Sequence, residues 1–324
     1  MNEIECVAGV CSARERVVGR FAPSPTGDLH MGSLMAAVAS FLAARSCGGR
    51  WLVRIEDVDR PREVVGAAAR ILFDLERFGF EWDGPVWFQS TRNERYRYAL
   101  DRLIKAGHAY PCACSRREIQ LTGLTAIDGY RYDGRCRTGL PAGRKALAWR
   151  LRVPDEQVAY LDGIQGVQSQ NLANDVGDFV LLRADGCWTY QLAVVVDDAE
   201  QGVNQVVRGA DLLDSTPRQI WVQRLLGYIE PQYMHIPVIA NSRGEKLSKQ
   251  TLAPALLKGG EAKQLWMALY LLWQSPPLDL RNATINEVWQ WALLHWSVNG
   301  MPQKRAVSVE IDRSLAYTFL KTNK

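Results

Sequence analysis

Residues suited to phosphate chemistry lie in two loops that are far apart in the sequence. The loop at residues 20–33 contains His30 and Gly32 after two prolines, and a later polar loop contains Lys246 and Lys249. Taken alone, the first loop is an ordinary turn and the second an ordinary solvated surface. Each loop, however, directly follows a predicted strand, so the two can meet around one polyphosphate. Histidine and lysine donors there stabilise the charge that develops as pyrophosphate leaves.

The elements that position these residues follow a parallel α/β pattern. Strands are predicted at 16–21 and 51–55, with a helix at 33–45 between them, which makes one βαβ unit. The second strand delivers Glu56 at its carboxyl end, where ligands of such sheets bind. The pattern resumes later, with helices at 190–200 and 217–226, strands at 203–207 and 235–240, and a loop at 208–211.

The segments outside this pattern are less regular. The sequence predicts helices at 62–79 and 93–106, an irregular stretch at 108–148, and strand-like pieces at 148–153 and 178–183. From residue 253 onward the chain is expected to be mostly helical. Five tryptophans are expected to pack in that part: Trp266, Trp273, Trp289, Trp291 and Trp296.

Length and composition set limits on the class of protein. The chain has 324 residues, enough for one large domain or two to three small ones, and its net charge of +4 is compatible with nucleic-acid binding without arguing for it. It contains no apolar run of about 18 residues, so no transmembrane helix is expected. Glu3 and Glu5 and the lack of a basic segment argue against a signal peptide. We expect a cytoplasmic protein in which residues 1–15 form a loose extension.

Seven cysteines, an odd number, indicate a reducing compartment rather than a disulfide framework. Three of them, Cys112, Cys114 and Cys136, cluster in the irregular stretch and resemble a structural zinc site. Tetrahedral zinc takes four ligands, and no histidine follows the cluster at metal-ligand spacing, although His108 precedes it. On the residues alone, three buried free cysteines remain an alternative.

The amino-acid sequences of the two loops resemble the signature motifs of class I aminoacyl-tRNA synthetases. Residues 23–33, PSPTGDLHMGS, are similar to the HIGH motif, and residues 246–250, KLSKQ, are similar to the KMSKS motif. Two further stretches, RIEDVDR at 54–60 and RGADLL at 208–213, resemble the glutamyl and glutaminyl members of the class. The matches span most of the chain and imply an α/β, Rossmann-like catalytic domain.

The resemblance assigns ATP to the two motifs and glutamate to the residues around the first. His30, Lys246 and Lys249 are implied as catalytic residues, and Gly32 and Ser248 as further ATP contacts. Glutamate has two carboxylates and one ammonium, so its site needs two cationic groups and one anionic group. The implied glutamate contacts, which include such groups, are Arg20, Phe21, Ala22, Pro23, Ser24, Glu56, Tyr190 and Arg208.

Some acidic positions have structural alternatives. Glu56 could form only an ion pair with Arg54 or Arg60, although its place at a strand end favours a site. Asp197 and Asp198, in the predicted helix at 190–200, are assigned no functional role.

The cysteine spacing and the short C-terminal part resemble one branch of this group, the glutamyl-Q tRNA(Asp) synthetases. In that branch a Cys-x-Cys…Tyr-x-x-x-Cys pattern binds zinc, which implies Cys112, Cys114, Tyr132 and Cys136 as ligands, with His108 as a lesser alternative. After the lysine loop there is room for one small helical domain, but not also for an anticodon-binding domain. The branch shares this truncation.

The resemblance implies a ligase that works in two steps. ATP, with Mg²⁺ on its phosphates, activates glutamate to glutamyl-adenylate, and the glutamyl group passes to queuosine at the anticodon wobble position of tRNA(Asp). No membrane and no obligate protein partner is implied. The alternatives are a truncated glutamyl-tRNA synthetase that acylates a tRNA 3′ end, a non-catalytic tRNA-binding paralogue and a zinc-dependent RNA-binding module. The expected organisation is a catalytic domain at 16–255, with a zinc-bearing insertion at about 108–187, and a helical C-terminal domain at 256–324.

Overall fold

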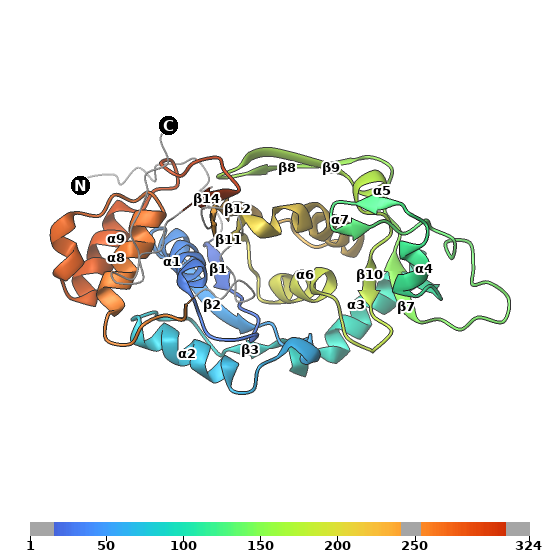
Figure 1. Ribbon diagram of the computed structural model, residues 1–324, viewed down its shortest axis with the longest axis horizontal. Coiled ribbons are helices and arrows are strands. Elements are labelled where there is room, and N and C mark those ends of the chain that lie inside the picture. Colours follow the sequence, from blue (N-terminus) through green and yellow to red (C-terminus); the bar gives the residue numbers. More distant parts are fainter. Residues whose placement is uncertain (1–15, 241–253, 309–324) are drawn as a thin grey trace.

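The protein has a mixed α/β architecture in an elongated molecule, with its parallel strands β1, β2, β11 and β12 between the two ends (Figure 1). The structure, a computed structural model, describes residues 16–240 and 254–308. Figure 1 places the C-terminal helices α8 and α9 at one end and the segment around α4 and β7 at the other. Within the described residues, no helix is both long and apolar enough to cross a membrane.

The first sheet contains the predicted βαβ unit. Strands β1 (Val18–Phe21) and β2 (Arg50–Ile55) pair in parallel, and helix α1 (Met31–Arg45) connects them. The short strand β3 (Trp87–Phe88) pairs in parallel with β2 on its other edge. The parallel unit is therefore confirmed, and its helix begins at Met31 rather than at Ser33.

The second parallel unit follows the insertion and lies beside β1. Strands β11 and β12 pair in parallel, and β11 contacts both β1 and α1. The single strand predicted at 235–240 is in fact two strands, divided at Pro237, which has no N–H to donate to a ladder. The loop predicted at 208–211 is also wrong, because Arg208 and Gly209 still belong to β11 and a 3₁₀ helix follows directly. The elements are α6 (Tyr190–Glu200), β11 (Gln205–Gly209), α7 (Thr216–Leu226), β12 (Gln232–Ile236) and β13 (Val238–Ala240).

The insertion has more regular structure than the sequence indicated. Its main sheet is antiparallel, with β7 between β10 and β4, and a β8–β9 hairpin leads back to β12. The sequence did not predict this hairpin, because β9 (Gly166–Asn171) is mostly polar and lacks apolar alternation. The other elements are β4 (Ala109–Cys112), α4 (Arg116–Gln120), β5 (Thr125–Ala126), β6 (Gly129–Tyr130), β7 (Ala148–Leu151), β8 (Gln157–Asp162), α5 (Leu172–Asp175) and β10 (Val180–Leu182).

The central strands separate two hydrophobic clusters, as in a doubly wound fold. In β2, Trp51 and Val53 belong to the cluster around α1, whereas Leu52 belongs to the cluster around α3, α6 and α7. In β11, Val207 belongs to the cluster around α1, and Val206 belongs to the cluster around α3, α6 and α7. Because side chains alternate along a strand, this division requires packed helices on both faces. Helices α2 (Ala67–Arg77) and α3 (Asn93–Lys105) contribute to the first and the second cluster respectively.

Helix α2 is shorter than the predicted helix at 62–79. A 3₁₀ turn (Arg60–Arg62) comes first, and Gly66, with φ of 75°, precedes the first residue of α2. A left-handed glycine cannot continue a right-handed helix, so the helix starts only after it.

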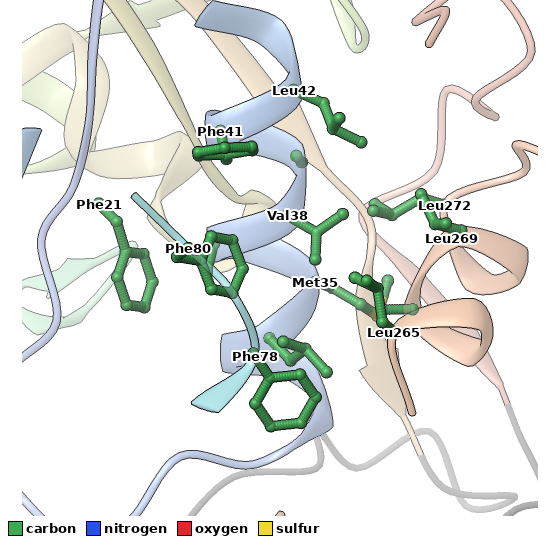
Figure 2. Close-up of a cluster of buried hydrophobic side chains, with 14 of the residues drawn as sticks. Phe21, Met35, Val38, Phe41, Leu42, Phe78, Phe80, Leu265, Leu269 and Leu272 are labelled. Carbon is green, nitrogen blue, oxygen red and sulfur yellow. The ribbon is translucent and has the colours of Figure 1, made fainter. Parts of the chain in front are cut away.

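The C-terminal helices share one hydrophobic cluster with α1. Figure 2 shows Met35, Val38 and Leu42 of α1 facing Leu265, Leu269 and Leu272, which lie on or next to α8. Each fully buried aliphatic side chain of this kind contributes about 1.5–3 kcal/mol. The contact therefore fixes the helix that begins at the first loop against the C-terminal part. The helices are α8 (Glu261–Leu271) and α9 (Ile285–His295), followed by β14 (Ala306–Ser308), which pairs with β13.

The expectation for the five tryptophans is largely confirmed. Trp266 and Trp289 are buried, and Trp291 and Trp296 are partly buried against the same cluster. Trp273 is 40% exposed and was wrongly predicted to pack. It lies two residues after the end of α8 and has a positive φ of 57°, so the regular backbone of the helix does not extend to it.

Candidate active site

A cleft of about 940 Å³ opens at the carboxyl ends of β1, β2 and β11. This is the edge at which parallel sheets bind ligands. Lys246, Ser248 and Lys249 lie outside the described residues, so their roles remain predictions. All other predicted glutamate and ATP contacts line the cleft: Arg20, Phe21, Ala22, Pro23, Ser24, His30, Gly32, Glu56, Tyr190 and Arg208.

The loop between β1 and α1 is attached to the segment that carries Glu56. The backbone N–H of Glu56 donates to the carbonyl of Pro23 at 3.0 Å. His30 caps α1, because its Nδ1 accepts from the backbone N–H of Ser33 at 3.2 Å. In the neutral ring the proton is then on Nε2, which can donate. A Cβ at Gly32 would lie 3.1 Å from the His30 ring, so glycine gives the ring its space.

A buried network of alternating charges lies behind the cleft wall. The guanidinium of Arg54 contacts Glu56 at 3.2 Å and Asp198 at 2.7 Å. Asp198 in turn accepts from Nε of Arg20 at 3.3 Å. The predicted alternative for Glu56 is thus correct in part, because Glu56 pairs with Arg54 and also lines the cleft. Asp198, to which the sequence assigned no role, holds Arg20 in place.

The two acids of this network have opposite pKa shifts. Burial raises the pKa of Glu56, and the charges of Arg54 and Arg20 oppose this effect without cancelling it. Burial also acts on Asp198, but there the charges of Arg20 and Arg54 outweigh it, so the pKa of Asp198 lies below its usual range. Asp198 therefore stays ionised, whereas Glu56 is a desolvated carboxyl group whose ionised form an additional cation would stabilise.

Asp197 anchors the helix that carries Asp198. It is fully buried, and its two oxygens accept from Nε of Arg92 at 2.6 Å, from the hydroxyl of Tyr96 at 2.8 Å and from the amide of Gln89 at 2.8 Å. These bonds tie α6 to α3 and to the turn after β3. Asp197 thus has a structural contact set and does not line the cleft.

Arg208 is held by three hydrogen bonds, two of them to residues that sequence reasoning missed. Nε donates to His235 Nε2 at 3.0 Å, and the two terminal nitrogens donate to the hydroxyls of Tyr190 and Thr216 at 2.9 Å each. Arg208 lies directly opposite His235 in the parallel register of β11 and β12. The signal that could have identified His235 is a histidine in a predicted strand, 235–240, whose other residues are all apolar.

The described residues on the two sides of the predicted lysine loop lie at the cleft or beside the first motif. Before the loop, Ile239 of β13 lines the cleft. After it, Ala255 forms a β-bridge with His30, and the N–H of Leu256 donates to the carbonyl of Leu29 at 3.0 Å. The described residues before and after the predicted lysine loop are therefore both close to the first motif.

Three buried thiols in the insertion are close enough to bind one metal ion. The sulfur atoms of Cys112, Cys114 and Cys136 all lie within 4.8 Å of one another, and His108 does not belong to this group. The Tyr132 hydroxyl lies 3.8 Å from the Cys114 sulfur and accepts from the backbone N–H of Cys136 at 2.8 Å.

Two distances within this group match the edge of a tetrahedral zinc site. With Zn–S bonds of about 2.3 Å, the edge of the tetrahedron is about 3.8 Å. The Cys114 and Cys136 sulfurs are 3.7 Å apart, and the Tyr132 oxygen is at a similar distance from Cys114. Arg150 stacks 4.1 Å over the Tyr132 ring, and its charge favours nearby thiolates. The three thiols could therefore hold a zinc ion, and Tyr132 as the fourth ligand stays a prediction.

Comparison with known proteins decides the family. Residues 16–267 match the family described as tRNA synthetases class I (E and Q), catalytic domain. The chain is also 60% identical over 291 residues to the glutamyl-Q tRNA(Asp) synthetase of Dechloromonas aromatica, covering 89% of this chain and 97% of that protein. This chain belongs to the glutamyl-Q tRNA(Asp) synthetase family. The protein of the same name from Chromobacterium violaceum is 58% identical, with 88% of this chain and 95% of that protein covered.

A solved structure supports the fold class. The chain is similar to a glutamate tRNA ligase from Elizabethkingia meningosepticum, crystallised in complex with its amino acid, with a TM-score of 0.75 and 26% identity. The match covers 90% of this chain and 67% of that one. The Rossmann-like class I catalytic fold expected from the sequence is thereby confirmed. As a member of a synthetase family with its catalytic domain, the chain is a ligase.

Proposed function

We propose that the protein uses ATP to activate glutamate and then transfers the glutamyl group to queuosine at the anticodon wobble position of tRNA(Asp). The observation that carries the first half is the charge pattern of the cleft. Arg20, Arg208 and Glu56 all line the cleft, and each of them is largely buried. Two cations and one anion complement the two carboxylates and the ammonium of glutamate.

In this proposal the raised pKa of Glu56 agrees with its role of binding the ammonium of glutamate. The ammonium of glutamate supplies Glu56 with the additional cation that a desolvated carboxylate needs. Asp198 and His235 engage Nε of Arg20 and of Arg208, and the hydroxyls of Tyr190 and Thr216 accept from the two terminal nitrogens of Arg208. Each terminal nitrogen of a guanidinium carries two N–H groups, so one of them can still donate to a carboxylate of glutamate.

The activation step is an in-line displacement at phosphorus. An oxygen of the glutamate α-carboxylate attacks the α-phosphorus of ATP, the bond to the β-phosphate oxygen breaks, and pyrophosphate leaves. His30 Nε2, together with Lys246 and Lys249, stabilises the charge on the departing phosphates. Ile239, before the lysine loop, lines the cleft, and Ala255, after the loop, forms a β-bridge with His30, which supports this grouping. Mg²⁺ on the phosphates would supply further charge neutralisation.

In the transfer step, a hydroxyl of the queuosine cyclopentenediol attacks the activated carbonyl and AMP leaves. The choice of this acceptor is supported by the relatives of the same name, which the chain matches over nearly their whole length. It is also supported by the three cysteines and Tyr132, whose spacing suits zinc. We propose a structural role for that zinc, since four protein ligands leave no open position for chemistry.

The test is an acylation assay with labelled glutamate and ATP. Four tRNA substrates are compared: tRNA(Asp) with and without queuosine, the queuosine-containing form trimmed of its 3′-terminal adenosine, and tRNA(Glu). The proposal requires label on both queuosine-containing tRNA(Asp) samples and none on the other two. Trimming is preferred to periodate, because periodate also cleaves the queuosine diol.

The alternatives give different outcomes in the same assay. Label on intact tRNA(Glu) alone would identify a glutamyl-tRNA synthetase that acylates a 3′ end. No label anywhere, with no glutamate-dependent exchange of pyrophosphate into ATP, would favour a non-catalytic tRNA-binding paralogue. The paired charges around Arg20 and Glu56 argue against lost chemistry.

A further inference from the structure

A fully buried histidine–aspartate pair stands directly behind Arg208. His235 on β12 and Asp162 at the end of β8 have no exposed side-chain surface, and His235 Nδ1 lies 2.5 Å from Asp162 Oδ2. The other oxygen, Oδ1, accepts from the backbone N–H groups of His235, Ile164 and Gln165 at 2.8–3.1 Å. Neither residue lines the cleft, whereas Arg208 does.

The hydrogen bonds fix the tautomer of the ring. Arg208 Nε–H is always a donor, so His235 Nε2, at 3.0 Å, must accept. The ring proton is then on Nδ1 and is donated to Asp162. Burial lowers the pKa of His235 to about 4, with the charge of Arg208 acting in the same direction and Asp162 opposing it, so the ring is neutral at pH 7. A neutral ring is required here, since a protonated one has no acceptor.

We propose that His235 and Asp162 are positioning residues that orient the Arg208 guanidinium for a glutamate carboxylate. Asp162 selects the Nδ1–H tautomer, the tautomer makes Nε2 an acceptor, and Nε2 holds Nε of Arg208. The Tyr190 and Thr216 hydroxyls hold the other two nitrogens, so the plane of the fork is fixed before the ligand arrives. This inference rests on the proposed activation of glutamate.

Three substitutions separate the positioning role from a merely structural one. His235→Gln keeps an acceptor near the position of Nε2 but loses the donor to Asp162. His235→Asn keeps a donor near the position of Nδ1 but loses the acceptor for Arg208. In Asp162→Asn, the three backbone donors select the side-chain oxygen, which turns the NH₂ group toward His235. The ring must then carry its proton on Nε2, where it opposes the Arg208 donor.

A matched control is available in the insertion. Asp178 is also a buried aspartate, and it accepts from the backbone N–H of Val153 at 2.9 Å and from the hydroxyl of Tyr110. Asp178→Asn therefore makes the same chemical change at a position that does not contact Arg208 or the cleft. It is expected to lower the thermal stability without changing the KM for glutamate.

The experiment is glutamate-dependent exchange of labelled pyrophosphate into ATP with the full chain, measured for each variant alongside its melting temperature. We expect the KM for glutamate to rise about tenfold or more in His235→Asn and Asp162→Asn, because a hydrogen bond to a charged group is lost. The KM for ATP should stay within about twofold, and His235→Gln should recover most of the glutamate affinity.

The outcomes distinguish this inference from the proposed function. If wild-type protein shows no glutamate-dependent exchange, the proposed function fails. If it does show exchange, but the asparagine variants have wild-type KM values for glutamate or His235→Gln is as impaired as they are, the positioning role is wrong. Should the asparagine variants not fold, ¹⁵N NMR of wild-type protein decides. An unprotonated Nε2 on His235 supports the positioning role of His235 and Asp162, and a protonated Nε2 overturns it.

Discussion

Replacement of Asp198 by asparagine tests the charge network that holds Arg20. In the wild-type protein Asp198 is an anion between two cations, 2.7 Å from Arg54 and 3.3 Å from Arg20, with side-chain exposures of 7% or less for all three. Asp198→Asn removes the negative charge and hardly changes the volume. Arg54 keeps Glu56 as a partner, but Arg20 loses the carboxylate that fixes its Nε.

The expected loss of stability follows from the burial of this pair. Removing one partner of a buried ion pair costs about 3–5 kcal/mol. Asparagine keeps one oxygen that can accept from Arg54, so we expect the lower end, about 3 kcal/mol, or about a hundredfold in the unfolding equilibrium. The KM for glutamate should rise as well, because Arg20 is no longer held toward the cleft.

Urea unfolding measures the stability, and an exposed ion pair supplies the control. Arg224 and Glu230 form a pair whose side chains are 40% and 38% exposed, so Glu230→Gln should cost about 1 kcal/mol or less. The reasoning is refuted if Asp198→Asn costs no more than this control. It is also refuted if the stability falls but the KM for glutamate does not change.

The pH dependence provides a second check on the same variant. The pKa of Asp198 is lower in the folded protein than in the unfolded chain, where it is about 3.9. Its contribution to stability is therefore complete above that value and is lost as the pH falls through the folded pKa. The difference between wild type and Asp198→Asn should be constant near neutral pH and shrink only below about pH 4.

Three further substitutions test other parts of the site. Glu56→Gln should raise the KM for glutamate yet stabilise the fold. Because the pKa of Glu56 is raised in the folded protein, the wild type loses stability as the pH rises from the unfolded pKa through the folded one. The difference in the free energy of unfolding between Glu56→Gln and the wild type, measured in urea, should therefore grow over that interval. An unchanged or lower stability of the variant at pH 7 would contradict the burial argument. His30→Asn should keep the helix cap and the melting temperature but lose pyrophosphate exchange, whereas His30→Ala should also lose about 1 kcal/mol of stability; full exchange in His30→Asn would leave His30 with only its cap. Cys136→Ser should abolish binding of one zinc per chain, measured by atomic absorption, whereas Cys187→Ser, a change of a half-buried free cysteine, should not; equal zinc in both variants would exclude the proposed ligand set.

The local pattern of the sequence was enough to predict the main elements. The βαβ unit, the helix at 190–200 and the parallel pairing after it are present, because buried strands and capped helices leave short-range signals. That the first loop and Glu56 line one cleft also followed, since strand ends of a parallel sheet meet at one edge. The other lining residues were implied by the family resemblance.

The partners of the site arginines depend on contacts that no local pattern encodes. Arg20 and Asp198 are 178 positions apart, and their contact depends on how α6 packs beside β1. His235 was predicted in a strand, but Arg208 was predicted in a loop, so their pairing across β11 and β12 was not apparent. Asp162 belongs to the β8–β9 hairpin, whose polar second strand gave no strand signal.

The position of the glutamyl group on tRNA(Asp) tests the central claim most directly. After incubation with ATP and glutamate, queuosine-containing tRNA(Asp) is digested to nucleosides under mildly acidic conditions and analysed by mass spectrometry. The account predicts a queuosine nucleoside that carries one glutamyl ester and an unmodified 3′-terminal adenosine. Glutamate on the terminal adenosine, with unmodified queuosine, would contradict it.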